Sequence, residues 1–197
     1  MPAQTNMPAD PGARAGEAPL VAAVVHVGGG AADPLLGEFA GLLRERGFRV
    51  RGLVQQRVGE GKAGVVLVDL GSGSSFPLFQ DLGRASTSCS LDTVSLSSAA
   101  AVLHRAIEER ADVAFANRFG AQEAEGRGLA PQMLAVMAEG IPLITIVSDA
   151  YLPAWRRFTD GVGLELPARL EALDAWFAGM RPGSGRAHRL PEDVEDL

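Results

Sequence analysis

A glycine-rich turn near the start of the chain carries the residues best placed to bind a charged ligand. The segment HVGGGAADP joins an apolar run at residues 20–27 to a leucine-rich helical pattern, and Gly28, Gly29 and Gly30 form its centre. A glycine turn that leads into a helix presents free backbone N–H groups, which bind anions together with the helix dipole. The turn therefore predicts an anion site, with Asp33 beside it.

The turn lacks two side chains that phosphate hydrolysis requires. The P-loop pattern G-x-x-x-x-G-K-[ST] supplies a lysine for the terminal phosphates and a hydroxyl for Mg²⁺. Here Ala32 stands at the lysine position, and Asp33 follows in place of the hydroxyl. A carboxylate about 4 Å from a phosphate charge repels it by roughly 4 kcal/mol at an effective dielectric constant of about 20. Lys62, the one lysine of the chain, precedes a strand pattern and has no Ser or Thr after it, so we do not expect it to replace the missing cation.

Two interpretations of the turn stay open. It retains anion binding through its backbone, or it is a tight turn in which Asp33 is the N-cap of the helix and Pro34 its first residue. The dinucleotide pattern G-x-G-x-x-G does not fit, because the three glycines are followed by Ala-Ala-Asp-Pro.

A second polar segment, NRFGAQEAEGRG, directly follows the apolar run ADVAFA. Arg118 or Arg127 could hold an anion through a bidentate guanidinium contact, with Glu123 orienting the arginine and Asn117 beside it. The alternative is a surface loop whose charges pair with one another. Because the segment leaves a buried strand, we favour a ligand-binding role for Asn117, Arg118, Glu123 and Arg127.

Nucleophilic and metal chemistry find little support. Cys89 is the only cysteine, so no intramolecular disulfide can form, and a redox or thiolate role for it stays open. His26, His104 and His188 show no metal-ligand spacing, and none is placed by sequence as a base for Cys89. We therefore predict no catalytic residue and no metal ligand, and the sequence specifies no cofactor.

Strand and helix patterns alternate along the chain, which predicts a three-layer α/β fold with a mostly parallel sheet. Strands are expected at 20–27, 48–54, 63–70, 111–117 and 141–148, with SSFPLFQ as a possible further strand of a hairpin after the first helix. Helices are expected at 35–46, from Asp92 or Thr93 onward, at 129–139, near 152–159 and near 168–179.

Ligands of such sheets bind beyond the carboxyl ends of the strands. The glycine turn and the polar segment each follow a buried strand. We therefore expect Gly28–Gly30 and residues 117–127 to face one another at one edge of the sheet.

Composition sets the domain organisation and excludes some partners. The 197 residues are 47% hydrophobic and 21% charged, which predicts one domain at 19–180 between disordered tails at 1–18 and 181–197, the second acidic. A net charge of −6 argues against a nucleic-acid partner. The longest apolar run is too short for membrane insertion, and the first residues do not read as a signal peptide, so we expect a cytoplasmic protein. A protein partner or a homodimer stays open.

The order of these elements resembles the small bacterial and archaeal nucleoside-triphosphatase family. More closely, the chain is similar to a bacterial domain family of unknown function, whose members are sometimes labelled molybdenum ABC transporter ATP-binding proteins. The resemblance spans residues 20–177, and the motifs that carry it are GLVQ at 52–55, QDLG at 80–83, Cys89 with Leu91 and Asp92, and NRFGAQEAEGRGL at 117–129. It implies a P-loop-NTPase-like fold with degenerate Walker A and Walker B motifs, because Asn117 and Arg118 stand where the triphosphatases carry their acidic Walker B pair.

Three functions are compatible with these observations. We favour a non-hydrolysing accessory or sensing protein that binds a small oxyanion or nucleotide, and the labels of its relatives suggest a link to molybdenum metabolism. The alternative enzyme is a nucleoside triphosphatase that uses Arg118 or Arg127 in place of the lysine. The third is a protein-interaction module without a ligand.

Overall fold

The computed structural model describes residues 19–26, 32–60, 64–77 and 93–180, with only the backbone for 93–97. Several predicted features lie outside these residues: both tails, Gly28–Gly30, Lys62, Asp92, and the segment from QDLG to Cys89. Within the described chain, no helix is long and apolar enough to cross a bilayer.

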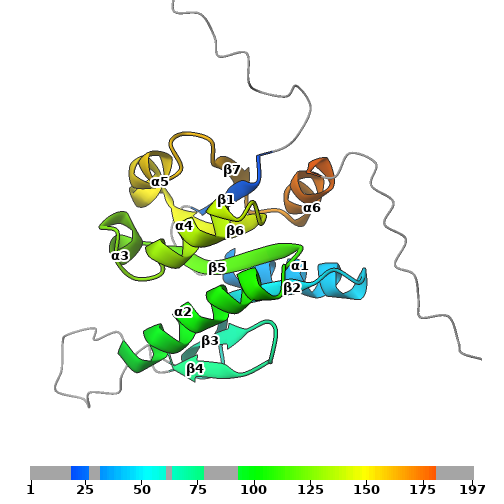
Figure 1. The fold of residues 1–197 in the computed structure, drawn as a ribbon, viewed down its shortest axis with the longest axis vertical. Coiled ribbons are helices and arrows are strands. Elements are labelled where there is room, and N and C mark those ends of the chain that lie inside the picture. Colours follow the sequence, from blue (N-terminus) through cyan, green and yellow to red (C-terminus); the bar gives the residue numbers. More distant parts are fainter. Residues whose placement is uncertain (1–18, 27–31, 61–63, 78–92, 181–197) are drawn as a thin grey trace, which may run out of the picture.

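Seven strands in the described residues form one sheet in the order β4-β3-β2-β5-β6-β1-β7 (Figure 1). The strands are β1 (Val21–His26), β2 (Val50–Arg57), β3 (Val65–Asp69), β4 (Ser75–Pro77), β5 (Val113–Phe119), β6 (Leu143–Ser148) and β7 (Leu164–Pro167). The five strands β2, β5, β6, β1 and β7 lie side by side in this order, and each is parallel to its neighbours. Strands β3 and β4 extend the sheet beyond β2 in antiparallel orientation. The predicted mostly parallel sheet and the hairpin after the first helix are therefore confirmed.

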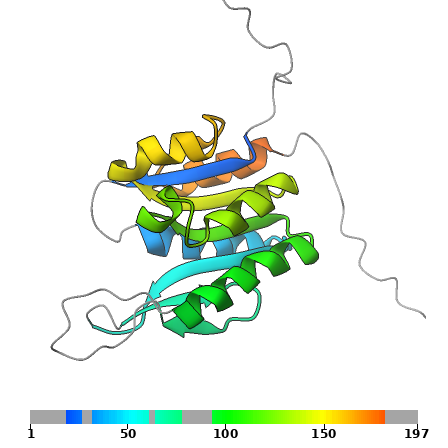
Figure 2. The ribbon, with the colours of Figure 1, turned by 60° about the vertical axis from the view of Figure 1, so that its left-hand side comes forward.

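Helices cover both faces of the sheet, as the two ribbon views show (Figures 1 and 2). They are α1 (Ala32–Glu45), α2 (Thr93–Glu108), α3 (Ala121–Ala124), α4 (Ala130–Ala138), α5 (Leu152–Phe158) and α6 (Leu170–Gly179), with a 3₁₀ turn at Asp149–Tyr151. One core holds Leu103 of α2, Met133 of α4 and Trp155 of α5, and the other holds Phe39 of α1 and Trp176 of α6. The central strands are buried on both sides, which explains why they are apolar at consecutive positions.

Several details differ from the sequence-based expectation. Strand β5 continues through Arg118 to Phe119, and the short helix α3 lies in the polar segment that follows. The interpretation without a ligand made Asp33 the N-cap of the first helix. Helix α1 instead begins at Ala32, so Asp33 lies in its first turn. Strand β7, which pairs in parallel with β1, was not predicted. Its four residues, LELP, are too few for a clear period-two pattern, and a proline ends them.

Gly52 allows β2 and β5 to approach closely. Its φ is +108°, and a Cβ there would lie 2.1 Å from the backbone oxygen of Phe115. Only glycine tolerates both the backbone conformation and this contact. The first residue of the GLVQ motif thus has a packing role.

Candidate functional site at the carboxyl edge of the sheet

A β-bulge in β5 sets the direction of Arg118. Phe115 pairs with Ile144 of β6 and Arg118 pairs with Ile146, so three steps along β5 correspond to two along β6. In a regular strand, residues three apart point to opposite faces. The bulge places Arg118 on the same face as Phe115, whose ring packs on Phe39 of α1 with 6.1 Å between the centroids. Arg118 therefore faces helix α1.

The guanidinium of Arg118 holds the carboxylate of Asp33 in a bidentate ion pair. Nε donates to Oδ1 at 3.0 Å and Nη2 donates to Oδ2 at 2.7 Å. The amide of Gln55, near the end of β2, adds a hydrogen bond to Oδ2 at 3.0 Å. Only 11% of the Asp33 side chain is exposed, so the loss of Arg118 would leave a carboxylate that is both buried and unpaired.

His26, the last residue of β1, also contacts Arg118. Nη1 of Arg118 lies 3.2 Å from Nε2 of His26. Because a guanidinium has no acceptor, Nε2 must accept this hydrogen bond, which puts the proton of the neutral ring on Nδ1. That Nδ1 atom is buried and has no hydrogen-bond partner in the described part of the chain.

Asn117 adds a second unsatisfied polar group at the end of β5. The residue is buried, and its Oδ1 atom has no hydrogen-bond partner among the described residues. Buried polar atoms are almost always paired, so unpaired ones indicate a place where another molecule or segment supplies the partner. His26 and Asn117 both lie at the ends of central strands, on the edge where ligands bind in this class of sheet.

Glu123 and Arg127 make their contacts within their own loop. The carboxylate of Glu123 accepts hydrogen bonds from the backbone N–H groups of Gly120 and Leu129, each at 3.0 Å. Gly128 has a φ of +59°, and a Cβ there would lie 2.2 Å from Glu123 Oε1. These contacts make Glu123 the organiser of the loop. Arg127 is largely exposed and pairs with Glu125.

The structure thus brings part of the predicted site together. Asp33 and Arg118 are in contact, Asn117 adjoins Arg118, and the contacts of Glu123 and Arg127 lie elsewhere. Gly28–Gly30 lie outside the described residues, but His26 and Asp33, which flank the turn, both contact Arg118. His26 and Gln55 were not predicted as site residues. Gln55 is the last residue of the GLVQ motif, and its contact with Asp33 could not be inferred from the residue types of that motif.

A protein family model described as "Protein of unknown function (DUF2478)" matches residues 21–176. The chain belongs to this family. A relative named molybdenum import ATP-binding protein ModC 2, from Bradyrhizobium diazoefficiens, is 34% identical to it over 176 residues. The match covers 88% of the chain but only 19% of that relative, so the chain spans about a fifth of its length.

Two solved structures have a similar fold to this DUF2478 domain. The solution structure of a human cancer-related nucleoside triphosphatase is similar with a TM-score of 0.55 and 16% identity, over 80% of this chain and 94% of the other. The crystal structure of THEP1 from Aquifex aeolicus is similar with a TM-score of 0.58 and 12% identity, over 81% and 96%. The P-loop-NTPase-like fold inferred from the resemblance is therefore confirmed.

Proposed function

We propose that this DUF2478 domain is a non-hydrolysing accessory or sensing domain that binds a small oxyanion at the carboxyl edge of β1, β2 and β5. The Asp33–Arg118 ion pair is the observation that carries the proposal. At the start of α1, where a P-loop enzyme needs a free lysine and a Mg²⁺-binding hydroxyl, this chain has an acid and a base that engage each other. Arg118 brings a guanidinium to the first turn of α1, but the pair does not supply the groups for phosphoryl transfer.

The hydrogen-bond donors at this edge fit an acceptor-rich ligand. A guanidinium has five N–H groups. Among the described residues, Asp33 accepts from two of those on Arg118 and His26 from one, so two make no hydrogen bond within this part of the chain. Nδ1 of His26, which carries the ring proton when Nε2 accepts from Arg118, makes no hydrogen bond to the described residues. A small tetrahedral oxyanion has acceptors on every side, whereas a triphosphate would bring several more negative charges close to Asp33.

Molybdate is the first oxyanion to test, because the relative carries molybdenum import in its name. Purified protein would be melted with molybdate, tungstate, sulfate, phosphate and Mg²⁺–ATP. A ligand at 100 times its dissociation constant raises the free energy of unfolding by about 2.7 kcal/mol. Arg118→Gln should abolish the oxyanion shift. Arg156→Gln is the matched control, because Arg156 also forms a bidentate pair with a carboxylate, Glu165, but on an exposed surface.

Failure of every oxyanion to shift the melting temperature at millimolar concentration would reject the proposal and favour a protein-interaction module. Retention of the full shift in Arg118→Gln would place the ligand elsewhere.

Nucleotide turnover separates this proposal from the enzyme alternative. We expect no Mg²⁺-dependent release of phosphate from ATP or GTP, because the guanidinium of Arg118 is held by Asp33. Release at on the order of 1 per second, a rate typical of enzymes, would contradict this. Loss of such turnover in Arg118→Ala would instead establish a triphosphatase with an arginine in place of the lysine.

A further inference from the structure

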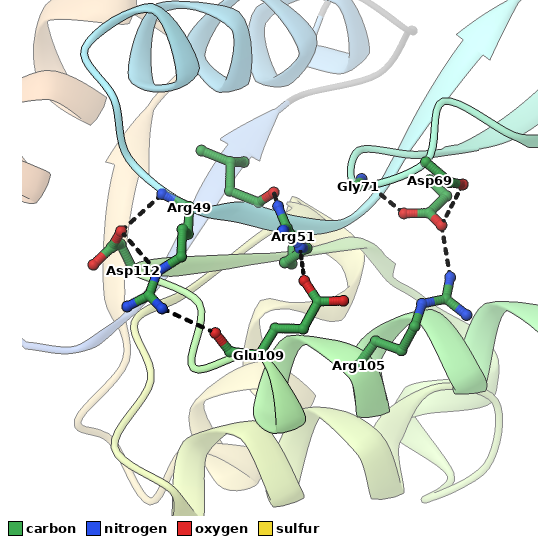
Figure 3. A network of polar contacts seen from close by, with 9 residues as sticks. Arg49, Arg51, Asp69, Gly71, Arg105, Glu109 and Asp112 are labelled. Atoms are coloured by element: carbon green, nitrogen blue, oxygen red, sulfur yellow. Dashed lines mark hydrogen bonds and ion pairs between the residues drawn. The ribbon is translucent and has the colours of Figure 1, made fainter. Parts of the chain in front are cut away.

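A second polar site lies near the start of β2, far along that strand from Gln55. It is a cavity of about 480 Å³ between β2, the β3–β4 turn and α2. Figure 3 shows the arginines and carboxylates gathered there. The residues that matter for its chemistry, called here the charged pocket, are Arg51, Asp69, Phe76, Val102, Arg105 and Glu109.

Asp69 lies buried at the floor of the pocket, and both oxygens of its carboxylate accept hydrogen bonds. Its side chain is only 2% exposed and accepts hydrogen bonds from the N–H of Gly71 at 2.8 Å, from Oγ of Ser72 at 2.7 Å and from Nη2 of Arg105 at 2.6 Å. Burial raises the pKa of Asp69, but these three hydrogen bonds together outweigh it and hold the pKa below its ordinary value. Asp69 therefore stays charged and fixes Arg105, without being free to bind a ligand.

The two arginines keep donors for a ligand. Arg105 uses one N–H for Asp69, and its side chain is 44% exposed. Arg51 donates Nε to Glu109 and Nη1 to the backbone oxygen of Val50, so three of its five N–H groups make no hydrogen bond to the residues that the structure describes. The turn competes little for an anion, because the N–H groups of Gly71, Gly73 and Ser74 already bind within it. An anionic group would therefore be held by the arginines.

Glu109 supplies the opposite charge. It lies four residues after Arg105, directly beyond the end of α2, and pairs with Arg51 through Oε2 (Figure 3). Its Oε1 atom makes no hydrogen bond within the described residues and so remains an acceptor. Phe76 and Val102 add an apolar wall. The pocket thus offers guanidinium donors, one carboxylate acceptor and an apolar surface.

The charges of the pocket sum to zero, since it holds two arginines and two carboxylates. A ligand with a net negative charge would meet Asp69 and Glu109, and a cation would meet both arginines. A ligand that carries both signs complements both halves. A volume of about 480 Å³ lies within the range of small-molecule sites.

We propose that the charged pocket binds a free α-amino acid in its zwitterionic form. The carboxylate binds Arg51 and Arg105, the ammonium group binds Glu109, and an apolar side chain packs on Phe76. This site is independent of the oxyanion site, because it uses none of the residues around Arg118.

Calorimetric titration of the full-length chain tests the proposal with matched ligands. Leucine and phenylalanine should bind. N-acetyl-leucine lacks the ammonium group, and leucinamide lacks the carboxylate. Each should bind with an affinity at least roughly tenfold lower than that of leucine, because each loses a charge-assisted hydrogen bond. Absence of binding by leucine, phenylalanine and the other apolar amino acids at millimolar concentration would overturn the proposal. Equal binding of leucine and N-acetyl-leucine would also overturn it.

Two variants separate ligand contact from structural support. Glu109→Gln should weaken leucine binding without weakening the binding of N-acetyl-leucine, an anion that Glu109 repels. Arg51→Gln should weaken leucine binding without weakening the binding of leucinamide, a cation that Arg51 repels. A merely structural role would weaken all ligands alike, and that result would reject the assignment. Arg156→Gln, which breaks an exposed pair on another surface, is the control for loss of an arginine.

Discussion

Asp33 and Arg118 lie 85 positions apart in the sequence and bind each other through two hydrogen bonds. Each has a clear consequence alone: the carboxylate repels phosphate, and the guanidinium attracts it. Together they form a neutral pair, and two N–H groups of the guanidinium make no hydrogen bond to the described residues. The anion affinity of the edge should therefore depend on how strongly Asp33 competes for Arg118.

Replacement of Asp33 tests this competition directly. Asp33→Asn removes the negative charge but keeps the shape of the side chain, so oxyanion binding should become tighter by roughly tenfold or more. Titration with molybdate or sulfate measures the change. Glu165→Gln, which removes the carboxylate partner of Arg156, should leave the affinity unchanged. Weaker binding in Asp33→Asn would mean that the aspartate positions Arg118 for the ligand instead of competing with it.

Asp69 predicts a dependence of stability on pH. Its pKa is lower in the folded chain than the value of about 3.9 expected when unfolded, so its charged form stabilises the fold above that pH, and this contribution is lost as pH falls through the lowered pKa. Asp69→Asn should lower the free energy of unfolding by about 1–3 kcal/mol at pH 7. Urea unfolding should show the difference from the natural chain shrinking below about pH 4. A difference that is constant with pH would assign the effect to lost packing.

At the scale of elements, the apolar runs predicted the central strands because those strands are buried on both faces. The side chains that meet at the edge were harder to infer. Arg118 faces α1 only because of a bulge in β5, and no residue of ADVAFANRF marks that bulge. Gln55 reaches Asp33 from a strand 22 positions later. Such contacts depend on the register between strands, which local sequence patterns do not encode.

Two glycines in the loop after β5 test how much the Glu123 carboxylate contributes to the stability of that loop. Gly126 and Gly128 both have positive φ, of +74° and +59°. A Cβ at Gly126 meets nothing within 4 Å, whereas one at Gly128 strikes the Glu123 carboxylate. Gly126→Ala should cost about 1 kcal/mol, and Gly128→Ala should cost about 2 kcal/mol or more, because the two hydrogen bonds of Glu123 are also disturbed. Urea denaturation measures the free energy of unfolding of both variants. An equal loss in the two would show that Glu123 does not stabilise the loop.

At the scale of the whole molecule, the two proposed sites lie toward opposite ends of β2, the one strand that both use. The oxyanion site uses the ends of β1, β2 and β5, and the charged pocket uses the start of β2, the β3–β4 turn and α2. Residues without shared contacts contribute almost independently to stability. The rigid sheet between the two sites gives each a fixed frame without requiring that one ligand change the affinity of the other.

The boundaries of the domain give the last prediction. The indole N–H of Trp176 in α6 donates to the backbone oxygen of Pro19 at 2.7 Å, and the N–H of Leu143 in β6 donates to that of Leu20 at 2.9 Å. Residues 19 and 20 are therefore part of the folded unit. A chain trimmed to 19–180 should unfold at the same temperature as the full chain. One trimmed to 21–180 should melt lower, because it loses both hydrogen bonds at about 1 kcal/mol each. Calorimetric melting of the three chains decides the matter: a lower melting temperature for 19–180 would show that the predicted tails contribute to the fold.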